Sequence, residues 1–279
     1  MPAKKFYTRI FLLLFLFLIG VVTMRLFFIS TFRITTNSME GSLEAGDFIV
    51  VNKFLFPRQA PLMIPFSDAG IPFTEWEGSA KPGRNSIIVF KFPEGRKDDP
   101  ANPAYVKRLV GLPGDTVLIK AGVVFVNGVK LAQPYGLKKG KTKTKNDNNS
   151  QLFPGNEEWN EDWYGPLYIP KKGDTIALNI STYMQWEDVI RGEQGDTSLF
   201  VQGHKFVLNG KVINSYIVQK DYYFVLGDNR DNSLDSRYWG YVPYDNLIGE
   251  VSFIYWSVDP FATGLTSWLR FNRFFKVVD

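Results

Sequence analysis

The sequence predicts a mainly β fold of bent, antiparallel strands that follows an N-terminal membrane helix. Short apolar segments recur along the chain and are broken by glycine, proline and asparagine, which is typical of strands joined by turns. No long amphipathic helix pattern separates these segments, which argues against an α/β enzyme with a parallel sheet. With 279 residues, of which 45% are hydrophobic and 16% aromatic, the chain can bury the core of one large domain or two modest ones.

The first element is an apolar helix. Basic residues precede an apolar run over 10–22, which continues less evenly to Ile29. A helix over 6–29 spans about 36 Å, more than the roughly 30 Å of the hydrocarbon layer. A cleavable signal peptide is the alternative, but residues 21–25 contain no pair of small residues with A-x-A spacing. We therefore expect residues 1–30 to be an uncleaved anchor with a cytoplasmic N-terminus.

The strands follow the anchor in short apolar stretches. We expect them at 48–54, 86–92, 104–110, 116–126, 205–208, 222–226 and 247–256. The Asn-Gly pairs at 127–128 and 209–210 predict two-residue hairpins, because both residues tolerate a positive φ. A Gly-Asp-Thr sequence precedes each pair, at 114–116 and 173–175. This echo is either a duplicated structural unit or two turns of a kind common in β proteins.

The composition excludes several kinds of site. The chain has no cysteine and therefore neither a thiol nucleophile nor a cysteine-ligated zinc ion. A Ser-His-Asp triad would depend on the one histidine, His204, which has no neighbouring carboxylate pattern, so we interpret it as a turn or surface residue. The net charge of +4 is mild and the charges are interleaved, so we expect no nucleic-acid partner.

Two of the three segments that are candidates for chemistry supply a nucleophile and a base. The first, residues 36–43, begins shortly after the anchor and contains Ser38. In the second, residues 105–115, strand alternation puts Lys107 on one face while Arg108 points the other way. If that face is interior, burial lowers the pKa of Lys107 and makes a neutral amine available as a general base.

The third candidate segment is a dense polar loop over 227–240, which follows a predicted strand. Its aspartates could bind calcium, but the loop lacks the acidic twelfth ligand of the common calcium loop, and we expect no metal ion. Asp235 with Arg237, among hydroxyls and turn residues, indicates a rigid scaffold that positions other groups.

In this order the three segments resemble the bacterial type I signal peptidase (leader peptidase) family, membrane-anchored serine proteases that remove signal peptides from exported proteins. Residues 107–115 match the family's K-R-x-x-G-x-P-G-D, and residues 227–240 match its G-D-N-x-x-x-S-x-D-S-R-x-x-G. The resemblance covers the anchor and about half of the remaining chain. It implies a β domain like that of signal peptidases, on the outer (periplasmic or extracellular) face of the bacterial cytoplasmic membrane.

The resemblance also implies the roles of the site residues. Ser38 would be the nucleophile and Lys107 the general base of a Ser-Lys dyad, without a cofactor. The Ser38 N–H and the Thr36 hydroxyl would stabilise the oxyanion. Ser233 would orient the lysine, and the ion pair of Asp235 with Arg237 would hold the loop.

The substrates implied by the resemblance are preproteins with signal peptides, cut after small residues, commonly alanine. The apolar residues that flank the proposed dyad are candidates for the substrate pockets: Phe32, Ile34, Met39, Leu43, Tyr105 and Val106. Ser38 follows the anchor so closely that catalysis should occur at the bilayer face, which makes the lipid bilayer a second partner. We expect a monomer.

The segment around Ser38 departs from the family pattern S-M-x-P-T-L. Gly41 and Ser42 stand where proline and threonine are usual, and Thr36 replaces a frequent serine. Glycine is more flexible than proline, so the stiffness of this turn needs another source. The β-branch of Thr36 restricts its hydroxyl, although a donor is kept.

The chain divides by these criteria into an anchor (1–30), a catalytic β domain in two parts (31–130 and 205–256), an inserted region (131–204) and a C-terminal tail (257–279). The inserted region is longer than in many members of the family and includes a polar, flexible loop over 138–150. The tail mixes aromatic and basic residues, which suits either the membrane interface or core packing.

Two other functions are compatible with parts of the sequence. A self-cleaving regulator would use the same dyad, but no internal cleavage site or DNA-binding domain is recognisable. In a non-catalytic, membrane-tethered β module, Ser38 would be a turn residue and Lys107 a surface cation.

Overall fold

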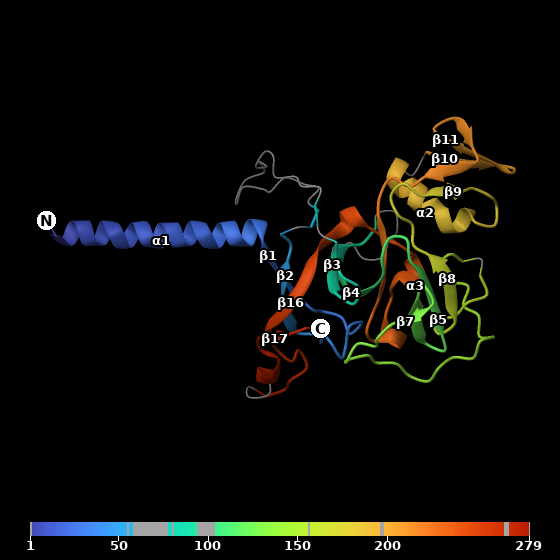
Figure 1. Ribbon diagram of the computed structural model, residues 1–279. Helices are drawn as coiled ribbons and strands as arrows, with labels where there is room; N and C mark the ends of the chain where they lie inside the picture. The colour runs from blue at the N-terminus through green and yellow to red at the C-terminus, as the bar shows by residue number, and fades with distance from the viewer. Residues whose placement is uncertain are drawn as a thin grey trace.

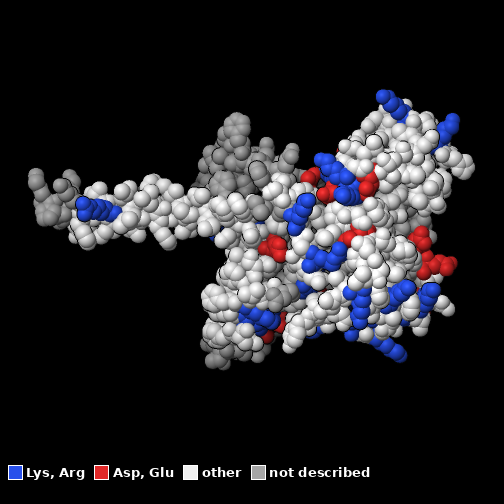
Figure 2. Space-filling view, viewed as in Figure 1, with Lys and Arg blue, Asp and Glu red and all other residues white. Residues whose placement is uncertain are grey.

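The computed structural model describes residues 2–54, 56–57, 78–79, 81–93, 104–155, 157–195, 198–264 and 268–278. Its first element, helix α1 (Pro2–Phe27), projects from the rest of the chain as a separate rod (Figure 1). The stretch Phe6–Arg25 is long and apolar enough to cross a membrane, and none of it is buried against the protein. Figure 2 shows this rod largely free of charge beyond a basic patch near its N-terminus, as a lipid-facing helix requires.

The main sheet has eight strands in the order β1-β2-β16-β3-β4-β14-β15, with β17 paired to β16. All described pairs are antiparallel, and register shifts within β16 and β14 allow the strands to bend, as expected. The strands are β1 (Ile29–Arg33), β2 (Asp47–Asn52), β3 (Ile87–Lys91), β4 (Ala104–Gly111), β14 (Tyr222–Leu226), β15 (Val242–Pro243), β16 (Leu247–Ser257) and β17 (Lys276–Val277).

Three smaller sheets lie beyond β4 and β14 (Figure 1). One has the order β7-β6-β5-β8, another pairs β9 with β13, and the third is β10-β11-β12. Their strands are β5 (Thr116–Lys120), β6 (Val123–Val126), β7 (Val129–Lys130), β8 (Tyr164–Tyr168), β9 (Thr175–Ala177), β10 (Leu199–Gln202), β11 (Lys205–Leu208), β12 (Lys211–Ile213) and β13 (Ser215–Ile217).

Both predicted Asn-Gly hairpins form. Asn127 and Gly128 have φ of 52° and 80°, and Asn209 and Gly210 have 50° and 78°, as a two-residue turn of this kind needs. The predicted single strand over 116–126 is instead β5 and β6, joined by a turn in which even the alanine at 121 has a positive φ. Alanine rarely adopts that conformation, and the glycine beside it, Gly122 with a φ of 75°, was the one signal of a turn within the apolar run.

Helix α2 (Tyr183–Gln194) was not predicted. Its buried residues Trp186, Val189 and Ile190 have helical spacing, but they are too few to distinguish the segment from the surrounding strands. The shorter helices are α3 (Ser236–Trp239) and the 3-10 turns Arg230–Asn232, Tyr244–Asn246 and Phe271–Arg273.

The two Gly-Asp-Thr sequences form the same local unit. Each opens a strand, β5 or β9, that pairs with a returning strand, β8 or β13. In the first unit the Gly114 N–H donates to the Ile169 carbonyl, and in the second the Gly173 N–H donates to the Val218 carbonyl. The carbonyl of the following aspartate accepts the return bond in both units, at 2.8 and 2.9 Å. The repeated Gly-Asp-Thr sequence therefore has the same backbone hydrogen-bond pattern at both places.

The range 131–204 does not fold apart from its neighbours. Its strands β8, β9 and β10 pair with β5, β13 and β11, which all lie outside this range. One hydrophobic cluster also joins α2 to β5 and β14 through Val189, Val117 and Phe224. The range is therefore continuous in structure with the strands that flank it.

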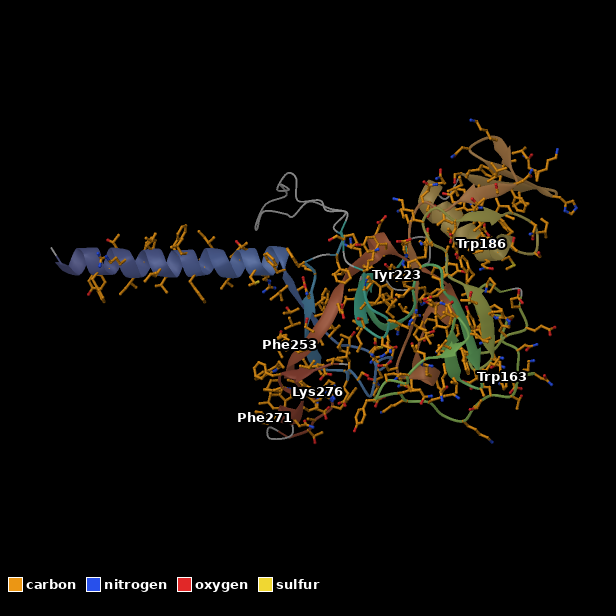
Figure 3. All side chains as sticks on the ribbon, in the orientation of Figure 1. Trp163, Trp186, Tyr223, Phe253, Phe271 and Lys276 are labelled. Carbon is orange, nitrogen blue, oxygen red and sulfur yellow. The ribbon has the colours of Figure 1, made fainter. Side chains whose placement is uncertain are left out.

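The tail packs two arginines inward, while Lys276 and several aromatic rings are exposed. The Arg273 guanidinium binds the buried Asp47 carboxylate at 2.6 Å, and Arg270 binds Glu44 at 2.7 Å. Phe271 is 67% exposed, on the edge of the molecule near β17 (Figure 3). Core packing therefore applies to the two arginines and to Phe274, whose ring centroid lies 4.5 Å from that of Trp256. Contact of the exposed rings with a membrane interface stays a prediction.

Candidate active site

Ser38 lies in a compact turn between β1 and β2. The turn is closed by hydrogen bonds from the Glu40 N–H to the Asn37 carbonyl at 3.0 Å and from the Leu43 N–H to the Met39 carbonyl at 2.8 Å. The Met39 and Leu43 side chains are buried in one hydrophobic cluster and attach the turn to the core. Ser38 itself is half-buried, so its hydroxyl remains accessible at the surface.

Lys107 is buried on β4 and only 3% exposed. Its Nζ donates to Ser233 Oγ at 3.1 Å. Burial lowers the pKa of Lys107 to about 8 because an ammonium loses its hydration there; the negative charge of Asp235 opposes this shift and Arg237 adds to it. The lysine that strand alternation places on one face of β4 is therefore interior, as expected.

Gly227 is the place where Ser38 and Ser233 meet. It follows the last residue of β14, Leu226, which pairs with Arg108 of β4. A Cβ on Gly227 would lie 2.1 Å from Ser233 Oγ and 2.6 Å from the Ser38 carbonyl oxygen. Ser38 and Ser233, far apart in sequence, thus meet where this glycine leaves space, and Lys107 is linked to this place by its bond to Ser233. The sequence pattern did not indicate this constraint on Gly227.

The hydroxyl of Ser38 lies 3.4 Å from the hydroxyl of Thr36, which is exposed. Lys107 donates to Ser233 in this structure, while the Ser38 backbone is held by the Asn229 N–H at 3.0 Å from its carbonyl. In the described part of the chain, no protein acceptor takes the Ser38 N–H. That donor is therefore available to a ligand.

Asp235 and Arg237 form a buried pair beneath the site. The Arg237 Nε and Nη2 donate to the two carboxylate oxygens at 2.8 and 2.9 Å, and Nη2 also donates to the Arg230 carbonyl at 2.7 Å. Asp235 accepts the Gly227 N–H at 3.0 Å. Burial favours the neutral acid, but Arg237 outweighs it and keeps the pKa of Asp235 below its usual value. The pair therefore holds both ends of the polar loop.

A second buried ion pair joins Arg108 to Asp228, neither of which the sequence marked as a site residue. The guanidinium is bidentate, with bonds of 2.9 and 2.8 Å, and the Ser42 hydroxyl donates to the same carboxylate at 2.6 Å. Ser42 thus ties the Ser38 turn to the polar loop. A threonine, the usual family residue, would offer the same hydroxyl, so this departure keeps the contact.

The apolar residues predicted to line substrate pockets divide into two sets. Ile34, Met39 and Leu43 are almost fully buried and present no surface to a peptide in this structure. The partly exposed residues are Phe32 and Val106, which pack on the same cluster, and Tyr105, which packs on Phe90 and Phe92 in a separate cluster.

A metal site and a histidine-dependent site would each need particular side chains close together in the described part of the chain. Among the described residues there is no group of three or more histidine, cysteine or acidic side chains that could hold a metal ion. His204 is exposed in the hairpin between β10 and β11.

The family model and the curated relatives both indicate one family. A family model described as signal peptidase, peptidase S26, matches residues 7–256. Signal peptidase I of Haemophilus influenzae is 30% identical over 95% of this chain and 74% of the relative, and that of Buchnera aphidicola subsp. Baizongia pistaciae is 34% identical over 85% and 73%. A solved signal peptidase I of Enterococcus faecalis is 24% identical, with a TM-score of 0.28, over 61% of this chain and 97% of the other. This chain belongs to the type I signal peptidase family, whose members are serine proteases.

Proposed function

We propose that this chain removes signal peptides from exported preproteins with Ser38 as nucleophile and Lys107 as general base. One observation carries the proposal: the buried Lys107 amine is hydrogen-bonded to Ser233 beside the space at Gly227, which the Ser38 backbone also borders. An amine of lowered pKa in the same site as the Ser38 turn is the kind of base that nucleophilic catalysis without histidine needs. Membership of the family favours this function over a self-cleaving regulator and over a non-catalytic module.

The reaction follows from these groups. Neutral Lys107 takes the proton of the Ser38 hydroxyl as the oxygen attacks the scissile carbonyl, and the resulting ammonium gives that proton to the leaving amine. Lys107, neutral again, then takes a proton from a water molecule as the water oxygen attacks the acyl carbonyl. The ammonium returns that proton to the Ser38 oxygen as the ester bond breaks, which releases the carboxylic acid and restores the enzyme. Ser233 supports this cycle because its oxygen accepts from Nζ at 3.1 Å and fixes the direction of the amine.

The oxyanion would be stabilised by two donors from the Ser38 turn. The Ser38 N–H is one of them, and its lack of a protein acceptor among the described residues supports this role. The Thr36 hydroxyl is the other, since it lies within 3.4 Å of Ser38 Oγ.

The substrate pockets are proposed to accept small residues at the first and third positions before the cut. Phe32, Tyr105 and Val106 are the residues of the predicted set with exposed surface. Changing the alanine before the cut of a preprotein to phenylalanine is expected to lower kcat/KM by roughly 100-fold, because the larger ring does not fit a shallow pocket. The measurement is cleavage of matched preproteins by the full chain in lipid vesicles. Equal rates for alanine and phenylalanine would contradict small-residue specificity.

The pH dependence of cleavage tests the base. Only neutral Lys107 accepts a proton, so kcat/KM is expected to rise about tenfold per pH unit at low pH and to level off above the pKa of about 8. Initial rates on one preprotein, measured over about two pH units on either side of that pKa, define the rising limb. His204→Ala is the control and should leave the limb in place. If the rise of kcat/KM occurred at a different pH in His204→Ala, the base would be the histidine and not Lys107.

The anchor is proposed to hold the catalytic domain on the outer face of the membrane, with the N-terminus in the cytoplasm. The basic residues before the apolar stretch support this orientation. Digestion of oriented vesicles with added protease distinguishes it from the reverse, because only an outward catalytic domain is degraded in right-side-out vesicles. The monomeric state remains a prediction.

A further inference from the structure

A segment of the inserted range, residues 133–140, reaches the Ser38 turn; we call it the strap. In Figure 1 the green chain after β7 meets the blue loop after β1. The strap lies along the polar loop: the Lys138 N–H donates to the Asp228 carbonyl at 2.8 Å, and the Arg230 N–H donates back to the Lys138 carbonyl at 2.9 Å. The Gly140 N–H adds a bond to the Asp231 carboxylate. The strap is thus bonded to the loop that carries Ser233.

The strap meets the Ser38 turn backbone to backbone, at two glycines. A Cβ on Gly41 would lie 1.8 Å from the Gly136 oxygen, and a Cβ on Gly136 would lie 2.3 Å from the Gly41 carbonyl carbon and 2.7 Å from the Ser42 nitrogen. No side chain fits at either position. Gly41 also has a φ of +105°, which a proline ring cannot adopt.

This contact accounts for the departure of Gly41 from the family's proline. Proline would stiffen the turn through its own ring, and glycine gives up that stiffness. Here the backbone of Gly136 closes the turn from outside, against a residue that follows Ser38 within the same turn. Packing against the strap therefore supplies the stiffness that the turn lacks without proline.

Side chains join the same three segments. Lys138 forms an ion pair with Glu40, and the Asn229 amide donates to the Asn37 carbonyl at 3.1 Å and to Glu40 at 3.2 Å. The Lys138 and Glu40 side chains are 50% and 36% exposed, so their pair contributes little by itself. The glycine contact and the backbone bonds therefore carry the arrangement.

We propose that the strap is a positioning element for catalysis, which holds the Ser38 hydroxyl at the right place relative to Lys107 and Ser233. The proposal rests on the function proposed above. It assigns a role to part of the inserted range, and it makes Gly41 and Gly136 a matched pair.

The test is Gly136→Ala in the full chain, assayed with a preprotein and with a short peptide that contains the same cleavage site. We expect kcat to fall roughly 100-fold for both substrates with little change in KM, because a nucleophile displaced by about 1 Å loses attack geometry and not substrate affinity. Gly83→Ala is the control, since a Cβ there meets only Ser86 Oγ at 3.5 Å. It should retain the wild-type kcat.

Two results would overturn the proposal. A wild-type kcat together with a lowered thermal midpoint would make the strap a stabilising element only. A rise in KM confined to the preprotein would make it a docking surface for substrate. If Ser38→Ala remained active, the proposed function would fail first; if Ser38→Ala were inactive and Gly136→Ala fully active, only the strap proposal would fail.

A milder variant guards against a protein that does not fold. Lys138→Pro removes the N–H that donates to Asp228, whereas Lys138→Ala keeps it and removes only the exposed ion pair. We expect kcat to fall at least about tenfold further for the proline variant than for the alanine variant, as loss of orientation predicts. Equal kcat values for the two would count against the strap.

The pairing of the glycines is tested by a double-mutant cycle. Gly41→Ala and Gly136→Ala disturb one contact, so the double variant should lose little more kcat than the worse single variant. Gly173→Ala is the control for Gly41, because it also has a positive φ but nothing within 4 Å of its Cβ. If the fold loss of kcat in the double variant equalled the product of the two single losses, the two glycines would not share one contact.

Discussion

Replacing Ser38 by alanine is expected to lower kcat for preprotein cleavage by at least about four orders of magnitude, because the attacking oxygen is lost. Lys107→Ala should cost a similar factor, since the Ser38 hydroxyl then has no amine to receive its proton. The two residues act in one step, so the double variant should be little slower than either single variant. Steady-state cleavage of one preprotein, with the variants at matched concentrations in vesicles, gives all three values.

The control for this pair is Ser215→Ala, which removes an exposed hydroxyl from β13, far from the dyad in the fold. Its kcat should equal that of the wild type. If Ser38→Ala and Lys107→Ala both cleaved the preprotein at the wild-type rate, the dyad would be wrong. If only Lys107→Ala lowered kcat, Lys107 would still be assigned as the base, but a residue other than Ser38 would have to be the nucleophile.

Arg237→Ala is expected to lower the free energy of unfolding by about 3–5 kcal/mol, because it leaves the Asp235 carboxylate buried without its partner. For a chain of this size that corresponds to a fall in the thermal midpoint of roughly 6–20 °C. Arg191→Ala is the control: its pair with Glu187 is partly exposed on α2 and should cost less than about 1 kcal/mol. Thermal unfolding followed by circular dichroism compares the two. Equal midpoints would contradict a structural role for the buried pair.

The same pair should also shift the pH dependence of catalysis, in opposite directions for its two members. The positive charge of Arg237 lowers the pKa of Lys107, and the negative charge of Asp235 raises it. Arg237→Ala should therefore move the rising limb of kcat/KM to higher pH, and Asp235→Asn should move it to lower pH. Shifts in the same direction would mean that the variants act through disorder of the loop and not through charge.

Sequence patterns predicted most of the main sheet. Strands β11 and β14 lie within the expected bounds, and β2, β3, β4 and β16 differ from them by one or two residues. Both hairpins formed because the conformation of Asn-Gly is set by local sterics, which do not depend on distant residues. The strands outside the expected ranges each have two to five residues, too few to show a clear alternation: β1, β7, β8, β9, β10, β12, β13, β15 and β17.

The chemistry of the candidate residues was also visible in sequence. The absence of cysteine and the single isolated histidine argued against a thiol nucleophile and a histidine base, and the resemblance to signal peptidases supplied Ser38 and Lys107. Strand alternation placed Lys107 and Arg108 on opposite faces, but only the structure showed that both side chains are buried. The pocket assignments were weaker. Apolar character does not tell a residue that lines a pocket from one that supports it, and Ile34, Met39 and Leu43 belong to the supporting core.

The sequence by itself determined the membrane helix, the β architecture and the kinds of side chain available, because these depend on hydrophobicity, local sterics and covalent chemistry. Only the tertiary structure decided where the groups meet. The space at Gly227, the hydroxyl contact of Ser42 and the fit of Gly41 against Gly136 each depend on atoms from segments far apart in the chain. A Cβ at any of these three glycines would collide with such atoms. A glycine in the sequence indicates that the backbone can adopt unusual dihedral angles or approach other atoms closely. Only the neighbouring atoms in the structure show which of these a given glycine serves.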